Sequence, residues 1–433
     1  MTQKPQPNLL LRGGSIVDPK SGQVIRADLL VRNGVIAEIG PSLDDVSDGI
    51  TLDCSGRYIS PGWMDMHVHL REPGFEYKET IVTGCAAAAY GGFTAVACMP
   101  NTDPPTHTRD VVEFIIERAE KLPVDVYPIA CVSKHREGKE LAEMADLQEG
   151  GAVAFSDDGS PVYDAGLMRR ALEYSSMLNA PIINHMEDLE LNRGGQMHEG
   201  SVATRLGLPG IPGLSEDVMV ARDILLSEFT GGRLHVAHIS TARSVDLVRE
   251  AKARGIRVTA EVCTHHFSLT DEAVETSDYS TNTKMHPPLR SAADVEAMKQ
   301  GLADGTIDAI CTDHAPHASF EKEVEYITAP FGIIGLETAW GLIGRELIAA
   351  GRLDLADAVS KITEAPRRIL GLQPVSVRVG DPANLTVFDA DTEWTFGRDC
   401  VKSKSHNSPF IGEKMRGRAW ATYNKGILTQ ISA

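Results

Sequence analysis

The middle of the chain alternates short apolar runs, rich in β-branched residues, with longer segments of helical periodicity. The apolar runs predict eight buried strands, at residues 64–69, 94–99, 124–131, 152–155, 181–185, 234–239, 256–263 and 307–311. The segments between them predict helices, for example at 81–90, 111–122, 165–178, 216–229, 244–253 and 294–303. Eight strand-then-helix units predict an α/β fold of the (β/α)8 TIM-barrel type, which we place at residues 63–372.

An open, doubly wound sheet is the alternative arrangement for the same order of strands and helices. Its nucleotide-binding version carries a GxGxxG or Walker-type loop directly after a strand. None of the eight predicted strands is followed by such a loop. The barrel is therefore the better prediction.

Both ends of the chain have a different pattern, with short apolar runs separated by tight turns. Asn33-Gly34 lies between two such runs and is typical of a β-hairpin. The tail beyond about residue 380 has the same character. We therefore expect one small β-rich domain built from residues 1–62 together with residues 373–433.

The charge of the chain narrows the classes of partner. Lys and Arg number 42 and Asp and Glu 60, so the net charge is −18, which disfavours nucleic acids and anionic membranes. Residues 81–102 are uncharged, but Gly91-Gly92 and Pro100 favour a helix, a turn and a strand over a membrane span. No signal-peptide pattern opens the chain and the seven cysteines form no CxxC pair, so we expect a cytoplasmic protein.

The first predicted strand carries the first chemical signal. Side chains alternate across a strand, so Asp65, His67 and His69 are expected on one face, opposite the intervening apolar residues. An isolated histidine in a strand is more often a hydrogen-bonded core residue than a ligand. Two imidazoles spaced by one residue at the carboxyl end of a strand can instead bind one metal ion.

Histidines and aspartates recur at the ends of four other predicted strands, where barrel enzymes build their sites. They are Asp157 and Asp158, His185, His238 and Asp313. With the first pair of histidines, and with one of the two neighbouring aspartates counted, they give six ligands, too many for one tetrahedral catalytic zinc. Six suit two metals that share a carboxylate and a hydroxide. Asp313 would then act as general base and afterwards protonate a leaving nitrogen, in the hydrolysis of a C–N bond.

The chain resembles the amidohydrolase superfamily and, within it, the dihydroorotases of the larger, bacterial-type class. The resemblance runs along essentially the whole chain. It rests on the segments 67–74 (HVHLREPG), 99–102 (MPNT), 156–159 (SDDG), 206–212 (LGLPGIP), 313–317 (DHAPH), 330–332 (PFG) and 407–410 (NSPF).

The resemblance implies the interconversion of N-carbamoyl-L-aspartate and dihydroorotate, a ring closure in pyrimidine (UMP) synthesis. It implies two zinc ions per chain, bridged by a hydroxide and a carboxylate. His67, His69 and Asp313 would hold one ion, and His185 and His238 the other.

The resemblance does not by itself identify the residue that supplies the bridging carboxylate. Many superfamily members use a carboxylated lysine on the fourth strand, but this chain has none there, and Lys134 comes too early. The class that it resembles uses an aspartate, for which Asp157 and Asp158 compete. The spacing to His185 favours Asp158.

The resemblance also implies the substrate contacts. Arg71, Asn101 and His317 match residues that hold the α-carboxylate of the substrate, and a guanidinium forks onto a carboxylate. A surface salt bridge of Arg71 with Glu72 or Glu76 is the alternative.

Four further residues complete the implied substrate-binding set: His69, His286, Phe331 and Gly332. The family usually has Asn where His286 precedes the segment 287–290 (PPLR). Both side chains donate a hydrogen bond, but His can also carry a charge. The contact made at this position is therefore left open.

Two other functions compete with this one. A hydantoinase or allantoinase shares the barrel and the ligands, but usually keeps the bridging lysine and lacks the arginine at position 71. A catalytically inactive scaffold of aspartate transcarbamoylase typically loses metal-binding histidines, and here all four are present. For the active enzyme we expect a small-molecule substrate, a homodimer and, as a further option, a complex with aspartate transcarbamoylase.

Overall fold

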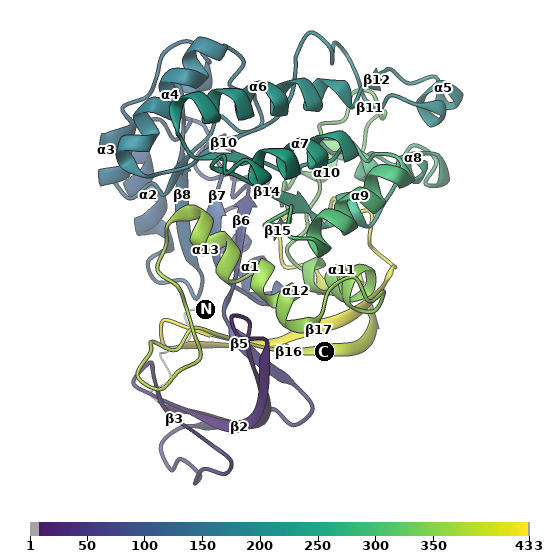
Figure 1. The fold of residues 1–433 in the computed structure, drawn as a ribbon. Coiled ribbons are helices and arrows are strands. Elements are labelled where there is room, and N and C mark those ends of the chain that lie inside the picture. Colours follow the sequence, from purple (N-terminus) through teal and green to yellow (C-terminus); the bar gives the residue numbers. More distant parts are fainter. Residues whose placement is uncertain (1–7, 432–433) are drawn as a thin grey trace.

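The computed structural model describes residues 8–431 and shows a barrel of eight parallel strands (Figure 1). Each strand pairs with its neighbours in the order of the sequence, and a parallel bridge between Val68 and His314 joins the last strand region to the first. The TIM-barrel prediction is confirmed. The barrel strands are β6 (Trp63–Val68), β7 (Phe93–Cys98), β8 (Asp125–Ala130), β9 (Ala154–Phe155), β10 (Ile182–Asn184), β13 (Leu234–Val236), β14 (Val258–Cys263) and β15 (Ala309–Cys311).

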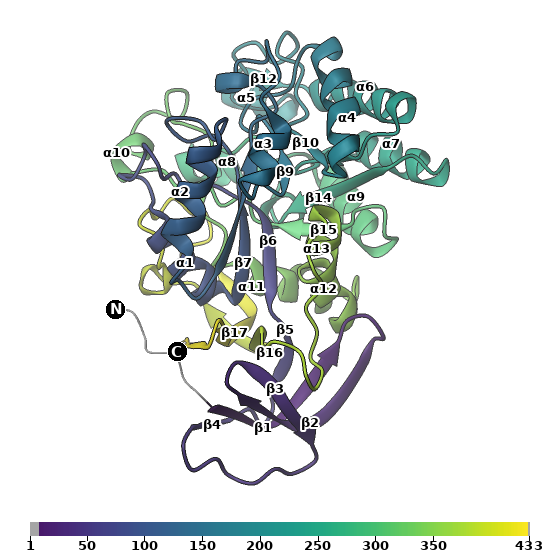
Figure 2. The same ribbon diagram turned by 90° about the vertical axis from the view of Figure 1, so that its left-hand side faces the viewer.

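Helices surround the barrel on the outside (Figures 1 and 2). They are α1 (Ile81–Gly91), α2 (Arg109–Ala119), α3 (Met144–Glu149), α4 (Ala165–Leu178), α6 (Leu214–Thr230), α7 (Ala242–Ala253), α9 (Ala292–Ala303), α11 (Ala339–Ile343), α12 (Leu355–Lys361) and α13 (Glu364–Leu370). Three short helices, α5 (Ser201–Leu206), α8 (Glu272–Thr276) and α10 (Ser319–Lys322), lie in the loops that follow β10, β14 and β15. Within residues 8–431, no helix is both long and apolar enough to cross a bilayer.

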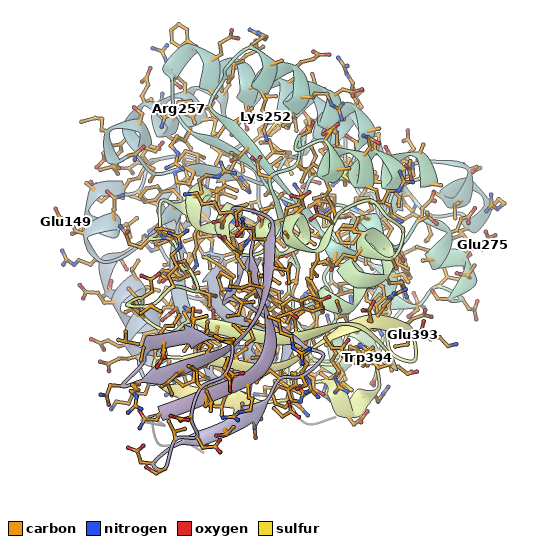
Figure 3. The ribbon with its side chains drawn as sticks, turned by 60° about the horizontal axis from the view of Figure 1, so that its bottom comes forward. Glu149, Lys252, Arg257, Glu275, Glu393 and Trp394 are labelled. Carbon is orange, nitrogen blue, oxygen red and sulfur yellow. The ribbon has the colours of Figure 1, made fainter. Side chains whose placement is uncertain are left out.

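The two ends of the chain combine in a second sheet, as the sequence predicts. Its strand order is β18-β17-β16-β5-β1-β2-β3, with β4 paired to β1. The strands are β1 (Asn8–Asp18), β2 (Gln23–Arg32), β3 (Val35–Gly40), β4 (Ile50–Asp53), β5 (Tyr58–Pro61), β16 (Leu385–Thr395), β17 (Lys414–Asn424) and β18 (Ile427–Gln430). Figure 3 looks toward this sheet, with Glu393 and Trp394 at one end of the C-terminal strands. A separate two-stranded pair consists of β11 (Met197–His198) and β12 (Gly210–Ile211).

The exact domain bounds of 1–62 plus 373–433 and 63–372 stay a prediction. One observation bears on them, because the connection between β16 and β17 leaves the second sheet. Phe396 and Phe410 in this connection pack in a buried cluster with Met285 and Ile333 of the barrel loops. The C-terminal part of the chain therefore contributes to both bodies.

The barrel lumen is apolar at its amino end and polar at its carboxyl end. Met64 and Met66 of β6 cluster in the lumen with residues of the other strands and with Ile369 of α13. This corrects the strict alternation expected for the first strand, because the pairing of β6 with β7 shifts in register between Asp65 and Val68. A register shift of this kind turns successive side chains to the same side. His67 is brought into the lumen above the two methionines by this shift.

An aromatic cluster joins the barrel to the second sheet. The Phe388 ring of β16 stacks on Tyr58, with ring centroids 5.5 Å apart, and lies 5.2 Å from Trp63 and 4.8 Å from Trp340. Trp63 and Phe388 are fully buried. Large aromatic side chains of this kind contribute much of the burial energy of a core.

We expect Phe388→Ala to lower the free energy of unfolding by about 3–5 kcal/mol, because it leaves a cavity between the two bodies. Phe229→Ala is the matched control, since this ring is 70 % exposed and packs against the guanidinium of Arg169. The control should cost about 1 kcal/mol or less. Urea denaturation followed by tryptophan fluorescence measures the stability of both variants. Equal midpoints would contradict the role of Phe388 in joining the barrel to the second sheet.

Candidate active site

Asp158 lies between two pairs of histidines at the carboxyl end of the barrel. Its Oδ2 atom is 3.5 Å from Nε2 of His67 and 3.5 Å from Nε2 of His69. Its Oδ1 atom is 3.8 Å from Nδ1 of His185 and 3.4 Å from Nε2 of His238. The two oxygens of one carboxylate therefore face two separate sets of imidazole nitrogens.

Asp313 completes the first of these sets. Its Oδ1 atom is 2.9 Å from Nε2 of His69 and 3.7 Å from Nε2 of His67. The residue follows β15 and has a left-handed backbone, with φ of 48°. His238 is also left-handed, with φ of 30°. Both conformations are unfavourable for residues with a Cβ atom, so the surrounding structure holds them in place.

Several atoms of this cluster are buried without a hydrogen-bond partner among the described residues. They are Nε2 of His67, Oδ1 of Asp158, Nε2 of His185 and Nδ1 of His238. Nδ1 of His185 and Nε2 of His238 lie only 2.9 Å apart. Buried polar groups in folded proteins are nearly always satisfied, so these atoms indicate a bound ion or water. Imidazole nitrogens and carboxylate oxygens are suitable ligands for a divalent metal.

The charge of the cluster favours cations. Burial by itself would raise the pKa of Asp158, but His67, His238 and His69 hold it well below its usual range. Asp313 behaves in the same way, since burial opposes ionisation and His69 and His67 favour it, with a net lowering of its pKa. Both carboxylates are thus anionic in a buried site. A buried negative charge is stable only when it is paired or bound to a metal.

Glu261 is a functional neighbour that the sequence analysis missed. Its Oε1 atom accepts a hydrogen bond from Nδ1 of His67 over 2.6 Å. Burial would raise its pKa, but His67 and His235 lower it to about 2. The carboxylate therefore fixes the His67 ring with Nε2 toward Asp158, as an outer carboxylate does for a metal-binding histidine. The available signal was a single charged residue inside the apolar run at 256–263.

The structure distinguishes between the two neighbouring aspartates. Asp157 points away from the histidines and accepts hydrogen bonds from the backbone N–H of Val132 (3.0 Å), from that of Ser133 (3.1 Å) and from the Ser133 hydroxyl. It is buried and ties two loops together. Asp158 alone of the pair faces the histidines.

Arg71 is a buried guanidinium beside this cluster. It is 8 % exposed, and its Nε atom donates to the carbonyl of Pro316 over 3.1 Å. No ion pair of Arg71 occurs among residues 8–431. The alternative pairing with Glu72 or Glu76 is therefore wrong, since Glu72 accepts from Arg118 Nε (3.0 Å) and Glu76 accepts from the Gly74 N–H (2.9 Å). Burial lowers the pKa of Arg71 to about 10, against the opposing charge of Asp313, so the group stays charged while no carboxylate within residues 8–431 forms an ion pair with it.

Asn101 and His317 lie on either side of this region. Nδ1 of His69 donates to Oδ1 of Asn101 over 2.7 Å, which leaves Nε2 free to face the carboxylates. Nε2 of His317 donates to the carbonyl of Phe331 over 2.8 Å. Burial and the nearby charges of Arg71 and Lys78 lower the pKa of His317 far below its usual value. His317 is therefore a neutral hydrogen-bonding group.

His286 and Phe331 lie on the other side of the cluster. Nε2 of His286 is 3.0 Å from Oε1 of Glu187, which also lies 3.3 Å from Nε2 of His185 through its other oxygen. The His286 ring packs against Phe331, with centroids 4.8 Å apart. Gly332 has φ of 129°, a backbone that favours glycine. A partner carboxylate, Glu187, thus accompanies the histidine at the position where an asparagine was expected.

Substitution of the two aspartates should separate structure from metal binding. Asp158→Asn is expected to lose most bound divalent metal, because it removes a charge that faces both sets of histidines. Asp157→Asn should retain the metal and lower the free energy of unfolding by about 1–3 kcal/mol, because the amide keeps one acceptor oxygen for the two backbone N–H groups but replaces the oxygen that accepts from the Ser133 hydroxyl. Elemental analysis and denaturation of both purified variants give the two readouts. The reverse pattern would exchange the two assignments.

Known proteins are similar to this chain in sequence and in fold. The dihydro-orotase-like family matches residues 56–244. A dihydroorotase of Pelotomaculum thermopropionicum is 55% identical over 414 residues, which covers 96% of each chain. A dihydroorotase of Citrifermentans bemidjiense is 51% identical over 420 residues, covering 97% of this chain and 98% of the other.

A solved structure supports the same fold. The L-hydantoinase (dihydropyrimidinase) of Arthrobacter aurescens superposes with a TM-score of 0.87 at 25% identity, covering 98% of this chain and 96% of the other. Its match spans both the barrel and the second sheet. The two dihydroorotases are 55% and 51% identical to this chain over nearly its whole length, whereas the L-hydantoinase is 25% identical. The chain therefore belongs to the dihydroorotase family.

Proposed function

We propose that the chain is a metal-dependent cyclic amidohydrolase that interconverts N-carbamoyl-L-aspartate and (S)-dihydroorotate plus water in pyrimidine synthesis. The observation that carries the proposal is the position of an unpaired, buried Arg71 beside two sets of metal ligands that share Asp158. The metal ligands suit hydrolysis of a ring amide. The guanidinium suits a substrate that carries a carboxylate next to that amide.

The ligand sets divide between two zinc ions in this proposal. His67, His69 and Asp313 would hold one ion, His185 and His238 the other, and Asp158 would contribute one oxygen to each. The unpartnered buried nitrogens and the distances to both Asp158 oxygens support this division. When bound, such a metal pair lowers the pKa of a water that it shares and stabilises negative charge on a carbonyl oxygen.

Asp313 is the proposed proton carrier. Its Oδ1 atom is engaged with His69, and its second oxygen remains for a proton. In ring opening, Asp313 would take a proton from the attacking water as the new C–O bond forms. It would then deliver this proton to the ring nitrogen as the C–N bond breaks, so that the carboxylate returns to its anionic form. Ring closure follows the same path in reverse.

The substrate carboxylate is the proposed partner of Arg71. The charged fork of Arg71 and the amide Nδ2 of Asn101 offer hydrogen-bond donors on one side of the metal site. The neutral ring of His317, whose Nε2 donates to the Phe331 carbonyl, would line the same side. His69, His286, Phe331 and Gly332 are proposed to line the rest of the ring pocket. An anionic substrate would therefore bind to a local positive charge on a protein of net charge −18.

The two rival functions have less support. The structural relatives include hydantoinases, but the bridging lysine that those enzymes usually keep is absent here. Lys134 does not reach the metal cluster, because its Nζ atom pairs with Oε1 of Glu140 at 2.7 Å. A scaffold without activity does not need the four converging histidines. A homodimer, a complex with aspartate transcarbamoylase and a cytoplasmic location stay predictions.

The decisive experiment is ring opening of L-dihydroorotate by the purified chain before chelation, after chelation and after addition of zinc. We expect activity to disappear with the metal and to return with about two zinc ions per chain. Hydantoin and allantoin serve as competing substrates. Turnover of hydantoin without turnover of dihydroorotate would replace the proposed substrate, and no turnover under any metal load would favour the scaffold function.

Arg71→Met tests the carboxylate site separately from the metals. We expect kcat/KM for L-dihydroorotate to fall roughly 30- to 5,000-fold, which corresponds to about 2–5 kcal/mol for a buried charge pair. Bound zinc should be unchanged, because Arg71 contacts neither histidine pair. Arg118→Met is the matched control, since Arg118 is half exposed and bonds Glu72. Loss of zinc with retained affinity for substrate would make Arg71 a structural residue.

A further inference from the structure

Two lysines are buried beside the proposed substrate pocket without a carboxylate partner. Lys284 is 1 % and Lys322 is 6 % exposed. Neither forms an ion pair among residues 8–431. A buried ammonium group is costly unless it is paired or fully hydrogen-bonded. The contacts that compensate these two charges are therefore informative.

The partners of both ammonium groups are mainly backbone carbonyls of one segment, residues 326–332. Nζ of Lys284 donates to the carbonyls of Tyr326 (2.7 Å) and Ile327 (3.0 Å), and to Oε1 of Gln196 (2.6 Å). Nζ of Lys322 donates to the carbonyls of Pro330 and Gly332, both over 2.9 Å.

The two lysines are also connected to one another. The backbone N–H of Gly332 donates to the carbonyl of Lys284 over 2.9 Å, and Nζ of Lys322 lies 3.5 Å from the same carbonyl. Each lysine therefore holds one end of the segment, and the two ends share one acceptor. The segment carries few ladder hydrogen bonds of its own, so the ammonium groups determine its path.

This segment reaches the proposed carboxylate site directly. The Phe331 carbonyl accepts the hydrogen bond of His317, and the Phe331 ring lies 4.7 Å from Nζ of Lys284 and packs against His286. Lys322 is close enough to His317 to contribute to the lowering of its pKa. Lys284 thus contacts Phe331 and Lys322 contacts Gly332, two residues that are proposed to contact the substrate.

We propose that Lys284 and Lys322 are specificity-determining positioning residues, a pair of buried ammonium groups that holds residues 330–332 against His317 and biases the pocket toward an anionic substrate. The inference rests on the proposed function, because it concerns the carboxylate of the same substrate. A neutral hydrogen-bonding side chain would be sufficient to hold the segment. The carbonyls solvate the ammonium groups without neutralising them, and the remaining positive charge adds an attraction that only an anion exploits.

The titration of the pair gives the proposal a pH signature. Burial lowers the pKa of Lys284 to about 8, and burial together with the charge of Lys284 lowers that of Lys322 to about 7, while Glu321 acts in the opposite direction. The other ionisable groups at the pair are Tyr326, beside Lys284, and His317. Lys322 is charged below a pH of about 7 and loses its charge as the pH rises through that value. Substrate affinity should decline over the same range.

The test compares Lys322→Gln, Lys322→Arg and Lys284→Gln with the wild-type holoenzyme. At a pH of about 6, we expect Lys322→Gln to raise KM for L-dihydroorotate about tenfold and to change kcat by less than about threefold. Its KM should also rise less between pH values of about 6 and about 9 than that of the wild type, because Lys284 alone still loses a charge over this range. Lys284→Gln should raise KM in the same direction. Lys322→Arg retains the charge, so its affinity should persist to the higher pH.

Lys361→Gln is the matched control for removal of a lysine that is partly buried and lies outside the site. Lys361 donates to the carbonyl of Ile307 over 2.8 Å, and burial lowers its pKa to about 8, but it lies on α12, away from the site. Its KM should equal that of the wild type at every pH. An unchanged KM in Lys322→Gln, a pH profile parallel to that of the wild type, or an equal rise in KM for Lys361→Gln would overturn the inference.

A measurement without turnover keeps the two proposals separable. Amide hydrogen exchange in residues 326–333 should accelerate in Lys322→Gln and remain unchanged in Lys361→Gln, whether or not the chain opens dihydroorotate. An inactive wild type with faster exchange in Lys322→Gln would count against the proposed function and support the positioning role. Unchanged exchange would overturn that role. If Lys322→Gln does not fold, the pH profile of Lys322→Arg decides, and a profile equal to that of the wild type contradicts the proposal.

Discussion

The burial of Asp158 among four imidazoles is the constraint on which the upper half of the barrel depends. An anion and several unpartnered nitrogens in a closed space are unfavourable unless a cation joins them. Neighbouring side chains orient the imidazoles for such a cation, since Glu261 fixes the ring of His67 and Asn101 fixes that of His69. An apolar cluster that includes Met64 and Met66 packs directly below these rings. The carboxyl half of the lumen therefore holds the polar site, and the amino half holds an apolar core that supports it.

Much of the site was predictable because its ligands stand at strand ends. Once eight strands are assigned, His185, His238 and Asp313 converge by topology alone, since the carboxyl ends of barrel strands meet at one face. The choice between Asp157 and Asp158 depends on the turn after β9, which no periodicity describes. The fold class followed from the order of strands and helices, and the union of the two termini followed from their shared turn-rich pattern.

Other features were beyond the reach of a sequence pattern, for identifiable physical reasons. Glu261 looks like an interruption of a buried strand until its distance to His67 is known. Lys284 and Lys322 resemble surface lysines, because a sequence does not reveal that two long side chains turn inward to meet carbonyls. His67 departs from the alternation expected for β6 because of a register shift, which depends on the pairing with β7. In each case the deciding information is long-range.

Three residues of the site, Arg71, His238 and Asp313, have left-handed backbones, with φ of 63°, 30° and 48°. Each such conformation costs on the order of 1 kcal/mol in a residue with a Cβ atom. The chain thus gives up folding stability at the positions where its chemistry is concentrated. Selection for heat resistance alone would favour glycine there and would remove the side chains that act. Thermostability and turnover are therefore opposed at these three positions, and improvements in stability are to be sought in the sheet and the helices instead.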